Sequence, residues 1–202
     1  MWTWSLNWGE ISPHIVVGSC PMSPADIGRI QSGVGVSAML SLQHDDCLAY
    51  WAIDYGVMQR QGMRLGLAMT RCPIRDFDVR DQRQRLPCAV AALARLRRKG
   101  HRVYVHCTAG LGRAPLAVLG YLTWIEGESP EHAIRRIHAA RPGAVPAWEA
   151  YHGCREDLLA RHRTGTARRA YALHETDCHR PALENWLAAE NEVLRAALSE
   201  LE

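Results

Sequence analysis

The sequence contains one lysine and one phenylalanine, and several patterns that define large protein classes are missing from it. No apolar run approaches the length needed to cross a bilayer, and no basic segment followed by an apolar one opens the chain. The seven cysteines are odd in number and include no C-x-x-C pair, so neither a disulfide framework nor a zinc site is expected. A net charge of +3 is too small to indicate nucleic-acid binding. We therefore expect a cytoplasmic protein without a metal, a cofactor, or a membrane or nucleic-acid partner.

The 202 residues are enough for one well-packed domain and an appendage. Strand-like runs fall mostly early in the chain and helix-like segments dominate later, which predicts an α/β fold with a central mixed β-sheet flanked by helices. The expected strands are 15–18, 34–42, 63–68 and 103–105. The expected helices are 24–33, 53–61, 86–99, 114–125, 129–140, 148–161 and 181–201.

The C-terminal part of the chain carries a candidate hinge, Thr164-Gly165-Thr166. It divides the chain into a main domain over residues 1–163 and an extension over residues 164–202. The last helix has apolar residues near helical spacing, and we expect it to dock on the main domain. A free or dimerising helix is the alternative.

The most informative stretch is His106-Cys107-Thr108-Ala109-Gly110-Leu111-Gly112-Arg113, between an apolar strand and a helix-like segment. Small and glycine spacers let successive N–H groups point into one concavity, and the following helix directs its positive end there. Arg113 adds a planar fork of donors that matches two phosphoryl oxygens. The same field would stabilise Cys107 as a thiolate and so as a nucleophile. The loop therefore predicts a phosphate cradle with a reactive cysteine.

The spacing of one cysteine and one arginine is a weak signal by itself, because a chain rich in both matches it often by chance. The preceding His106, the β-branched strand, the two glycines and the helical continuation make an accidental match improbable. We expect His106 to hold the loop through hydrogen bonds, since its place in the strand turns its side chain away from the phosphate.

A cysteine nucleophile needs an acid to protonate the leaving oxygen and a base to activate water, and one aspartate can do both. Four of the aspartates upstream of the cradle are candidates for this role. They are Asp54, Asp76, Asp78 and Asp81. A surface or capping role is the alternative for each.

Residues 105–115 resemble the signature of cysteine-dependent dual-specificity phosphatases, in particular the glucan phosphatases of the starch-excess, like-starch-excess and laforin type. Arg75-Asp76-Phe77-Asp78 is similar to the Arg-Asp-Phe-Asp of the starch-excess enzyme, whose first aspartate is the acid. The resemblance thus implies Asp76 as the acid, with Asp78 as the alternative. It extends over about residues 15–158 and implies a dual-specificity-phosphatase-like catalytic domain in residues 1–163. Ala114 departs from most of the wider family, where Ser or Thr helps the thiolate to leave.

Seven tryptophans are present, and flat aromatic faces suit sugar rings. Tyr50 and Trp51 follow a polar stretch in an expected loop that resembles the variable loop of the like-starch-excess enzyme, whose Tyr-Trp pair contacts glucan. Phe77 matches an aromatic residue that also touches the glucan chain. Trp8, together with Trp4, falls in the segment that corresponds to the family's recognition region. The alternative for tryptophans in helical apolar patterns is a place in the core.

The sequence therefore predicts a metal-independent phosphatase that hydrolyses phosphate monoesters on an α-glucan such as starch or glycogen through a phosphocysteine intermediate. A protein phosphatase acting on phosphotyrosine or phosphothreonine is the first alternative. A silent glucan- or phosphate-binding module is the second.

Overall fold

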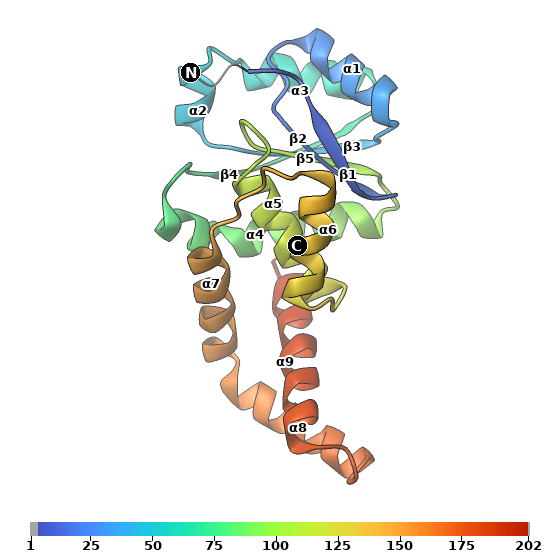
Figure 1. Cartoon of the computed structure of the whole chain (residues 1–202), viewed down its shortest axis with the longest axis vertical. Helices are drawn as coiled ribbons and strands as arrows, with labels where there is room; N and C mark the ends of the chain where they lie inside the picture. Colours follow the sequence, from blue (N-terminus) through green and yellow to red (C-terminus); the bar gives the residue numbers. More distant parts are fainter. Residues whose placement is uncertain (1–3, 202) are drawn as a thin grey trace.

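The computed structural model describes residues 4–201, and it contains a five-stranded mixed sheet of order β1-β2-β5-β3-β4 (Figure 1). Strands β2 (Ile15–Gly18), β5 (Val103–His106), β3 (Ala38–Gln43) and β4 (Ala68–Ile74) run parallel to their neighbours. Strand β1 (Trp8–Ser12) joins the edge antiparallel to β2. The expected α/β fold with a central mixed sheet is confirmed.

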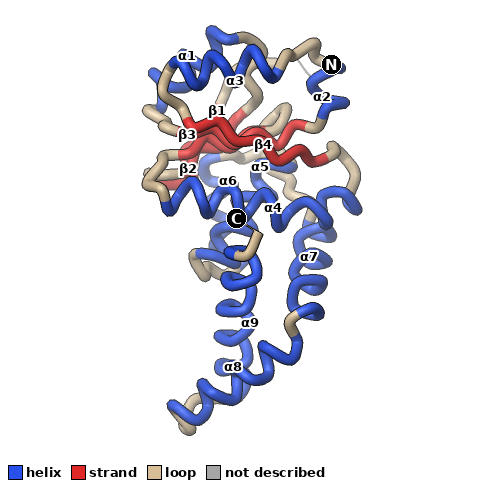
Figure 2. Tube along the Cα trace, turned by 180° about the vertical axis from the view of Figure 1, so that it is seen from behind, coloured by secondary structure: helices blue, strands red, loops and turns tan. Residues whose placement is uncertain are grey.

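Helices cover both faces of the sheet (Figure 2). One face carries α1 (Pro24–Val34), α2 (Asp45–Tyr50) and α3 (Tyr55–Arg64). The other face carries α4 (Val79–Arg98), α5 (Arg113–Gly120), the π-helical turn η1 (Tyr121–Ile125), α6 (Pro130–Ala140) and α7 (Trp148–Arg161). No helix in the described range is long and apolar enough to cross a membrane.

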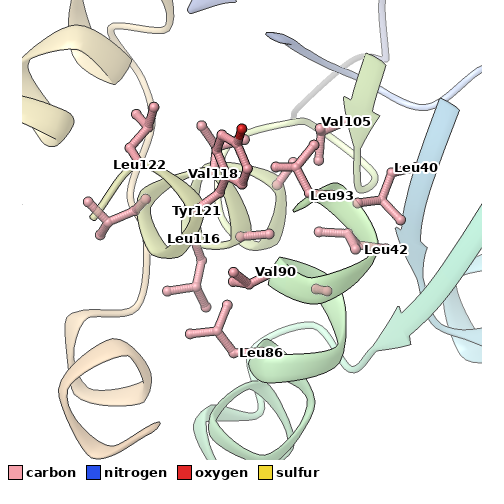
Figure 3. Close-up of a cluster of buried hydrophobic side chains, with 14 of the residues drawn as sticks. Leu40, Leu42, Leu86, Val90, Leu93, Val105, Leu116, Val118, Tyr121 and Leu122 are labelled. Atoms are coloured by element: carbon pink, nitrogen blue, oxygen red, sulfur yellow. The ribbon is translucent and has the colours of Figure 1, made fainter. Parts of the chain in front are cut away.

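The side chains of β2, β3 and β5 are buried on both faces, as two helical layers require. Val16, Met39 and Tyr104 belong to the cluster under α1 and α3. The residues that follow each of these in sequence belong to the larger cluster on the opposite face, because side chains alternate along a strand. Figure 3 shows part of that larger cluster, where α4 and α5 pack on the sheet.

Three expected elements differ from the observed ones, and one observed strand has no expected counterpart. The strand expected over 34–42 begins at Ala38, because Val34 is still in α1 and Gly35 ends that helix with a left-handed φ of 62°. The strand expected over 63–68 is wrong, since α3 runs to Arg64 and β4 begins only at Ala68. Helix α4 begins at Val79 and contains Pro87 in its interior. Strand β1 was not expected from the sequence.

The hinge expected at Thr164-Gly165-Thr166 is also wrong. These residues lie in α8 (Arg163–Thr176), where Thr166 is buried and its hydroxyl donates to His162 O at 3.2 Å. The change of direction occurs at His162, where α7 ends. Helix α8 and the start of α9 (Ala182–Ser199) extend away from the sheet as a hairpin (Figure 1).

The last turns of α9 return to the main body. Leu194 and Leu198 are buried in the same cluster as Trp124 and Leu122 of η1. Ion pairs between Arg169 and Glu192 and between Arg155 and Glu190 hold α9 to α8 and α7. The final helix therefore packs on the main domain through its C-terminal half.

Candidate active site

The candidate site lies at the carboxyl edge of the parallel strands. The cradle follows β5, the segment of Asp76 follows β4, and α2 follows β3. Parallel strands present all these connections at the same edge of the sheet, where α/β proteins bind ligands. Residues that are 30 to 60 positions apart in sequence thus meet around Cys107.

The carbonyl groups of the cradle loop are held on its outer side. Thr108 O accepts from the backbone N–H of Cys20 at 2.9 Å, Ala109 O from Arg141 Nη2 at 2.8 Å, and Leu111 O from the N–H of Val145 at 2.7 Å. No backbone N–H of residues 108–112 donates to another backbone group in the part of the chain described. These amides remain available to an anion, as in other backbone concavities.

His106 anchors the start of the loop. Its Nδ1 lies 3.1 Å from Cys107 O, and complete burial lowers the pKa of His106 to about 4. The ring is therefore neutral near pH 7, and Nδ1 must carry the proton because a carbonyl oxygen can only accept. This geometry agrees with a loop-holding side chain.

Gly110 is required by the path of the loop. Its φ is 71°, and a Cβ at this position would lie 2.3 Å from Gly18 O. Gly112 differs, because the nearest atom to a Cβ placed there is Val145 O at 3.9 Å. Of the two glycines in the cradle, backbone geometry therefore demands the first.

Arg113 is the first residue of α5 and is 1% exposed. Its Nη1 donates to Ile74 O at 3.0 Å and to Cys47 Sγ at 3.3 Å. Its Nη2 donates to Asp76 Oδ2 at 2.7 Å and to Thr108 Oγ1 at 3.2 Å. Burial opposes the charge of this guanidinium, but Cys107, Asp76 and Cys47 outweigh it and raise the pKa of Arg113. The site thus holds a permanent cation beside Cys107.

The four candidate aspartates have different hydrogen-bond partners. Only Asp76 reaches Arg113, whereas Asp78 Oδ1 caps α4 by accepting from the N–H of Asp81 at 2.9 Å. Asp81 Oδ2 accepts from the N–H of Arg75 at 2.7 Å and so holds the segment before Asp76. Asp54 caps α3 through the N–H of Val57. Capping occupies Asp54 and Asp78, and Asp76 alone among the four lies at the cradle.

Two adjoining cavities open over the cradle. One has a volume of about 540 Å³ and is lined by Cys107, Asp76 and Gln82 together with apolar residues around Val145. The other has a volume of about 550 Å³ and is lined by Tyr50, Trp51, Cys47 and Thr108 among others. Phe77 and Leu111 line both cavities, and Phe77 is 94% exposed. Both volumes lie in the usual range for small-molecule sites.

The structure corrects two expectations about the aromatic residues. Tyr50 and Trp51 were expected in a loop, but Tyr50 is the last residue of α2 and Trp51 ends that helix. Trp8 is not at the site: it packs on the α1 side of the sheet, with its ring against Gly33. Trp4 donates through Nε1 to Cys20 O at 3.2 Å. Of the predicted aromatic contacts, the structure brings Tyr50, Trp51 and Phe77 to the cavities.

Several residues of the site were not found from the sequence. Cys47 and Arg141 contact the cradle from α2 and from the end of α6, and Gln82 lines the cavity from α4. No local pattern marks them, because packing of distant segments brings them there. Cys20 is also close, but burial, followed by the charge of Cys107, raises the pKa of Cys20 to about 12. Among the described residues no cluster of three or more His, Cys, Asp or Glu side chains could hold a metal ion.

Several known proteins are similar to this chain in sequence. Phosphoglucan phosphatase DSP4, amyloplastic, of Castanea sativa is 35% identical over 156 residues, which are 76% of this chain and 41% of that protein. Phosphoglucan phosphatase LSF1, chloroplastic, of Arabidopsis thaliana is 33% identical over 77% of this chain and 26% of its own. Laforin of Mus musculus is 28% identical over 86% of this chain and 53% of its own. The chain thus spans about half or less of the length of these relatives.

Solved structures share the fold. The crystal structure of PTPMT1 has a TM-score of 0.61 at 20% identity and covers 78% of this chain and 99% of that chain. A family profile described as the dual specificity phosphatase catalytic domain matches residues 41–153, more than half of the chain. The matched range contains the cradle, Asp76 and α2. The chain therefore belongs to the dual specificity phosphatase family, as its signature loop predicts.

Proposed function

We propose that the chain is a cysteine-dependent phosphatase that removes phosphate monoesters from an α-glucan. The observation that carries this proposal is that Cys107 and Asp76 line one cavity above the buried Arg113, which donates to Asp76. The walls of this cavity and of its neighbour include Tyr50, Trp51 and Phe77. Relatives that bear the name phosphoglucan phosphatase support the substrate class. A cytoplasmic location remains a prediction.

In the first step the Cys107 thiolate attacks phosphorus while the bond to the sugar oxygen breaks. The backbone amides of residues 108–112 and the Arg113 guanidinium hold the three remaining phosphoryl oxygens. The Nε–H of Arg113 is buried without a partner among the described residues, so it has a donor to offer a phosphoryl oxygen. Asp76 gives its proton to the sugar oxygen, which leaves as a hydroxyl.

In the second step the Asp76 carboxylate accepts a proton from water as the water oxygen attacks the phosphocysteine. The phosphorus–sulfur bond breaks, its electron pair returns to Cys107, and inorganic phosphate leaves. Asp76 must release Arg113 during this cycle, because its Oδ2 lies 2.7 Å from Nη2 of that side chain. Exchange of this ion pair for a pair between phosphate and Arg113 keeps the buried guanidinium compensated.

The aromatic residues supply the sugar-binding surface in this proposal. Tyr50 is 80% exposed and lies edge-to-face with Trp51 at a centroid distance of 5.2 Å, on one side of the cradle. Phe77 stands next to Asp76 and lines both cavities. Large exposed rings at the mouth of a cavity favour ligands that stack C–H faces, as pyranose rings do.

The test compares phosphate release from phosphorylated amylopectin and from a phosphotyrosine peptide by one preparation of the full chain. We expect faster release from the glucan and inhibition of that release by soluble maltooligosaccharide. Cys107→Ser should lose both activities. Equal or faster release from the peptide, without an effect of oligosaccharide, would indicate a protein phosphatase. Glucan binding without any turnover would indicate a binding module.

A further inference from the structure

Gln82 interrupts an apolar stripe on α4. The residues at helical spacing from it, Val79, Leu86 and Ala89, pack in or against the main hydrophobic cluster. Gln82 points to the same side of the helix and is only 6% exposed. A leucine or methionine would suit this position, because a buried amide carries a free-energy cost unless its polar atoms are paired. The presence of glutamine at this position needs an explanation.

Gln82 lines the cavity over Cys107, where polar side chains are few. Asp76, Cys107 and Gln82 are the polar side chains among its described lining residues. The rest of the wall is apolar or backbone and includes Val145, Pro146 and Ala147, a segment held against the cradle by the bond from the Val145 N–H to Leu111 O. The first two polar side chains belong to the proposed chemistry, whereas the amide of Gln82 has no part in it.

The hydrogen-bonding capacity of Gln82 is largely unused within the protein. Its Nε2 donates to Arg75 O at 3.5 Å, the outer limit for such a bond. No group within residues 4–201 donates to its Oε1. A primary amide can make up to four hydrogen bonds, so Gln82 retains both donor and acceptor capacity in the cavity of the nucleophile.

The geometry points to Gln82 as a specificity-determining residue that hydrogen-bonds a hydroxyl group of the ring that carries the phosphate. This inference rests on the proposed function and identifies a polyhydroxylated leaving group as the substrate class. A sugar hydroxyl both donates and accepts, which matches an amide that offers Nε2 and Oε1. The cavity of about 540 Å³ has room for a pyranose ring beside the phosphate.

The experiment uses two alkyl phosphates that differ only in ring hydroxyl groups and ring oxygen, glucose 6-phosphate and cyclohexylmethyl phosphate. Both leave as primary alcohols, so a displaced Asp76 would slow both equally. In Gln82→Met, which preserves length and shape, kcat/KM for glucose 6-phosphate should fall about tenfold, the size expected for losing one hydrogen bond to a bound hydroxyl. The value for cyclohexylmethyl phosphate should stay unchanged or rise.

Gln84→Met is the matched control, because Gln84 is exposed two residues later on the same helix. It should leave both values unchanged. Equal losses on the two esters in Gln82→Met, or no loss on either, would overturn the inference, as would a wild type that does not prefer the sugar ester. A wild type that prefers glucose 6-phosphate but does not act on phosphoglucan would remove the glucan substrate and leave the role of Gln82 standing.

Discussion

Asp76 and Asp78 are two residues apart and chemically identical, yet their surroundings give them different tasks. Asp76 pairs with Arg113 at the cradle, and Asp78 satisfies the N–H of Asp81 at the start of α4. An N-cap residue stabilises the helix that follows, and Asp78 lines neither cavity of the site. The cap also keeps the Asp76 segment in place, because Asp81 in turn holds the N–H of Arg75.

The two aspartates can be separated by the same substitution. Asp76→Asn should lower kcat on an alkyl phosphate by about 10²–10⁴, because asparagine cannot supply the proton. Asp78→Asn should leave kcat almost unchanged, since asparagine caps a helix as well as aspartate does. Steady-state kinetics and denaturant unfolding of both variants check this. A large loss of kcat in Asp78→Asn with normal stability would indicate that Asp78, and not Asp76, is the acid.

His106 makes the stability of the fold depend on pH. Burial lowers the pKa of His106 from 6.5 to about 4, so between these values the unfolded chain binds a proton that the folded chain does not. Stability is therefore lost as pH falls from 6.5 towards 4, by about 2 kcal/mol between pH 7 and pH 5. His106→Asn keeps an amide donor near Nδ1 and removes the titration. Urea unfolding at the two pH values should show a smaller loss in the variant, and parallel losses would contradict the prediction.

At the scale of elements, α2 and the Asp76 segment form the two aromatic borders of the site. Phe77 has a positive φ of 56° and is 94% exposed, so neither its backbone nor its burial favours an aromatic residue there. A costly conformation that exposes a large ring is typical of a functional position. Its neighbours explain how it persists, since Asp78 caps α4 immediately after it.

Phe77→Ala should therefore leave the free energy of unfolding within about 0.5 kcal/mol of wild type. Its kcat/KM on phosphoglucan should fall about three- to tenfold, as expected for the loss of one stacking contact, with little change on 4-nitrophenyl phosphate. Tyr171→Ala is the control, because Tyr171 is 64% exposed on α8 and away from both cavities. Equal losses on the two substrates would show that Phe77 acts on the chemistry and does not bind sugar.

The sequence predicted the elements whose signals are local. The cradle, with Cys107, Gly110 and Arg113, occupies eight consecutive residues. Its reactive side chains and the glycine that shapes the loop can therefore be identified from one short stretch of sequence. No local pattern marks Arg141, which follows the helix expected over 129–140, because its role at Ala109 O depends on a contact 32 residues away in sequence. Thr164-Gly165-Thr166 has the composition of a hinge, but burial of Thr166 overrides that propensity.

At the scale of the whole molecule, the C-terminal hairpin is joined to the catalytic face through a continuous core. Leu198 and Leu194 pack in the cluster that also holds Leu86 and Leu93 of α4, the helix that carries Gln82 and Asp81. The last helix thus supports the element that positions Asp76. Sequence patterns identified α9 as amphipathic, but which of its turns dock could be decided only by the position of the partner surface.

Leu198→Ala removes a fully buried side chain and should lower the free energy of unfolding by about 2–5 kcal/mol. Leu183→Ala on the same helix should change it by no more than about 0.5 kcal/mol, because Leu183 is 69% exposed in the part of α9 that extends away from the body. Urea unfolding of both variants measures the effect on stability. Measuring kcat at urea concentrations well below the unfolding transition measures the effect on catalysis separately. Since Leu198 lines neither cavity of the site, kcat per folded molecule should stay near wild type. Equal stability of the two variants would mean that α9 does not dock in solution, and the extension would then be a free arm.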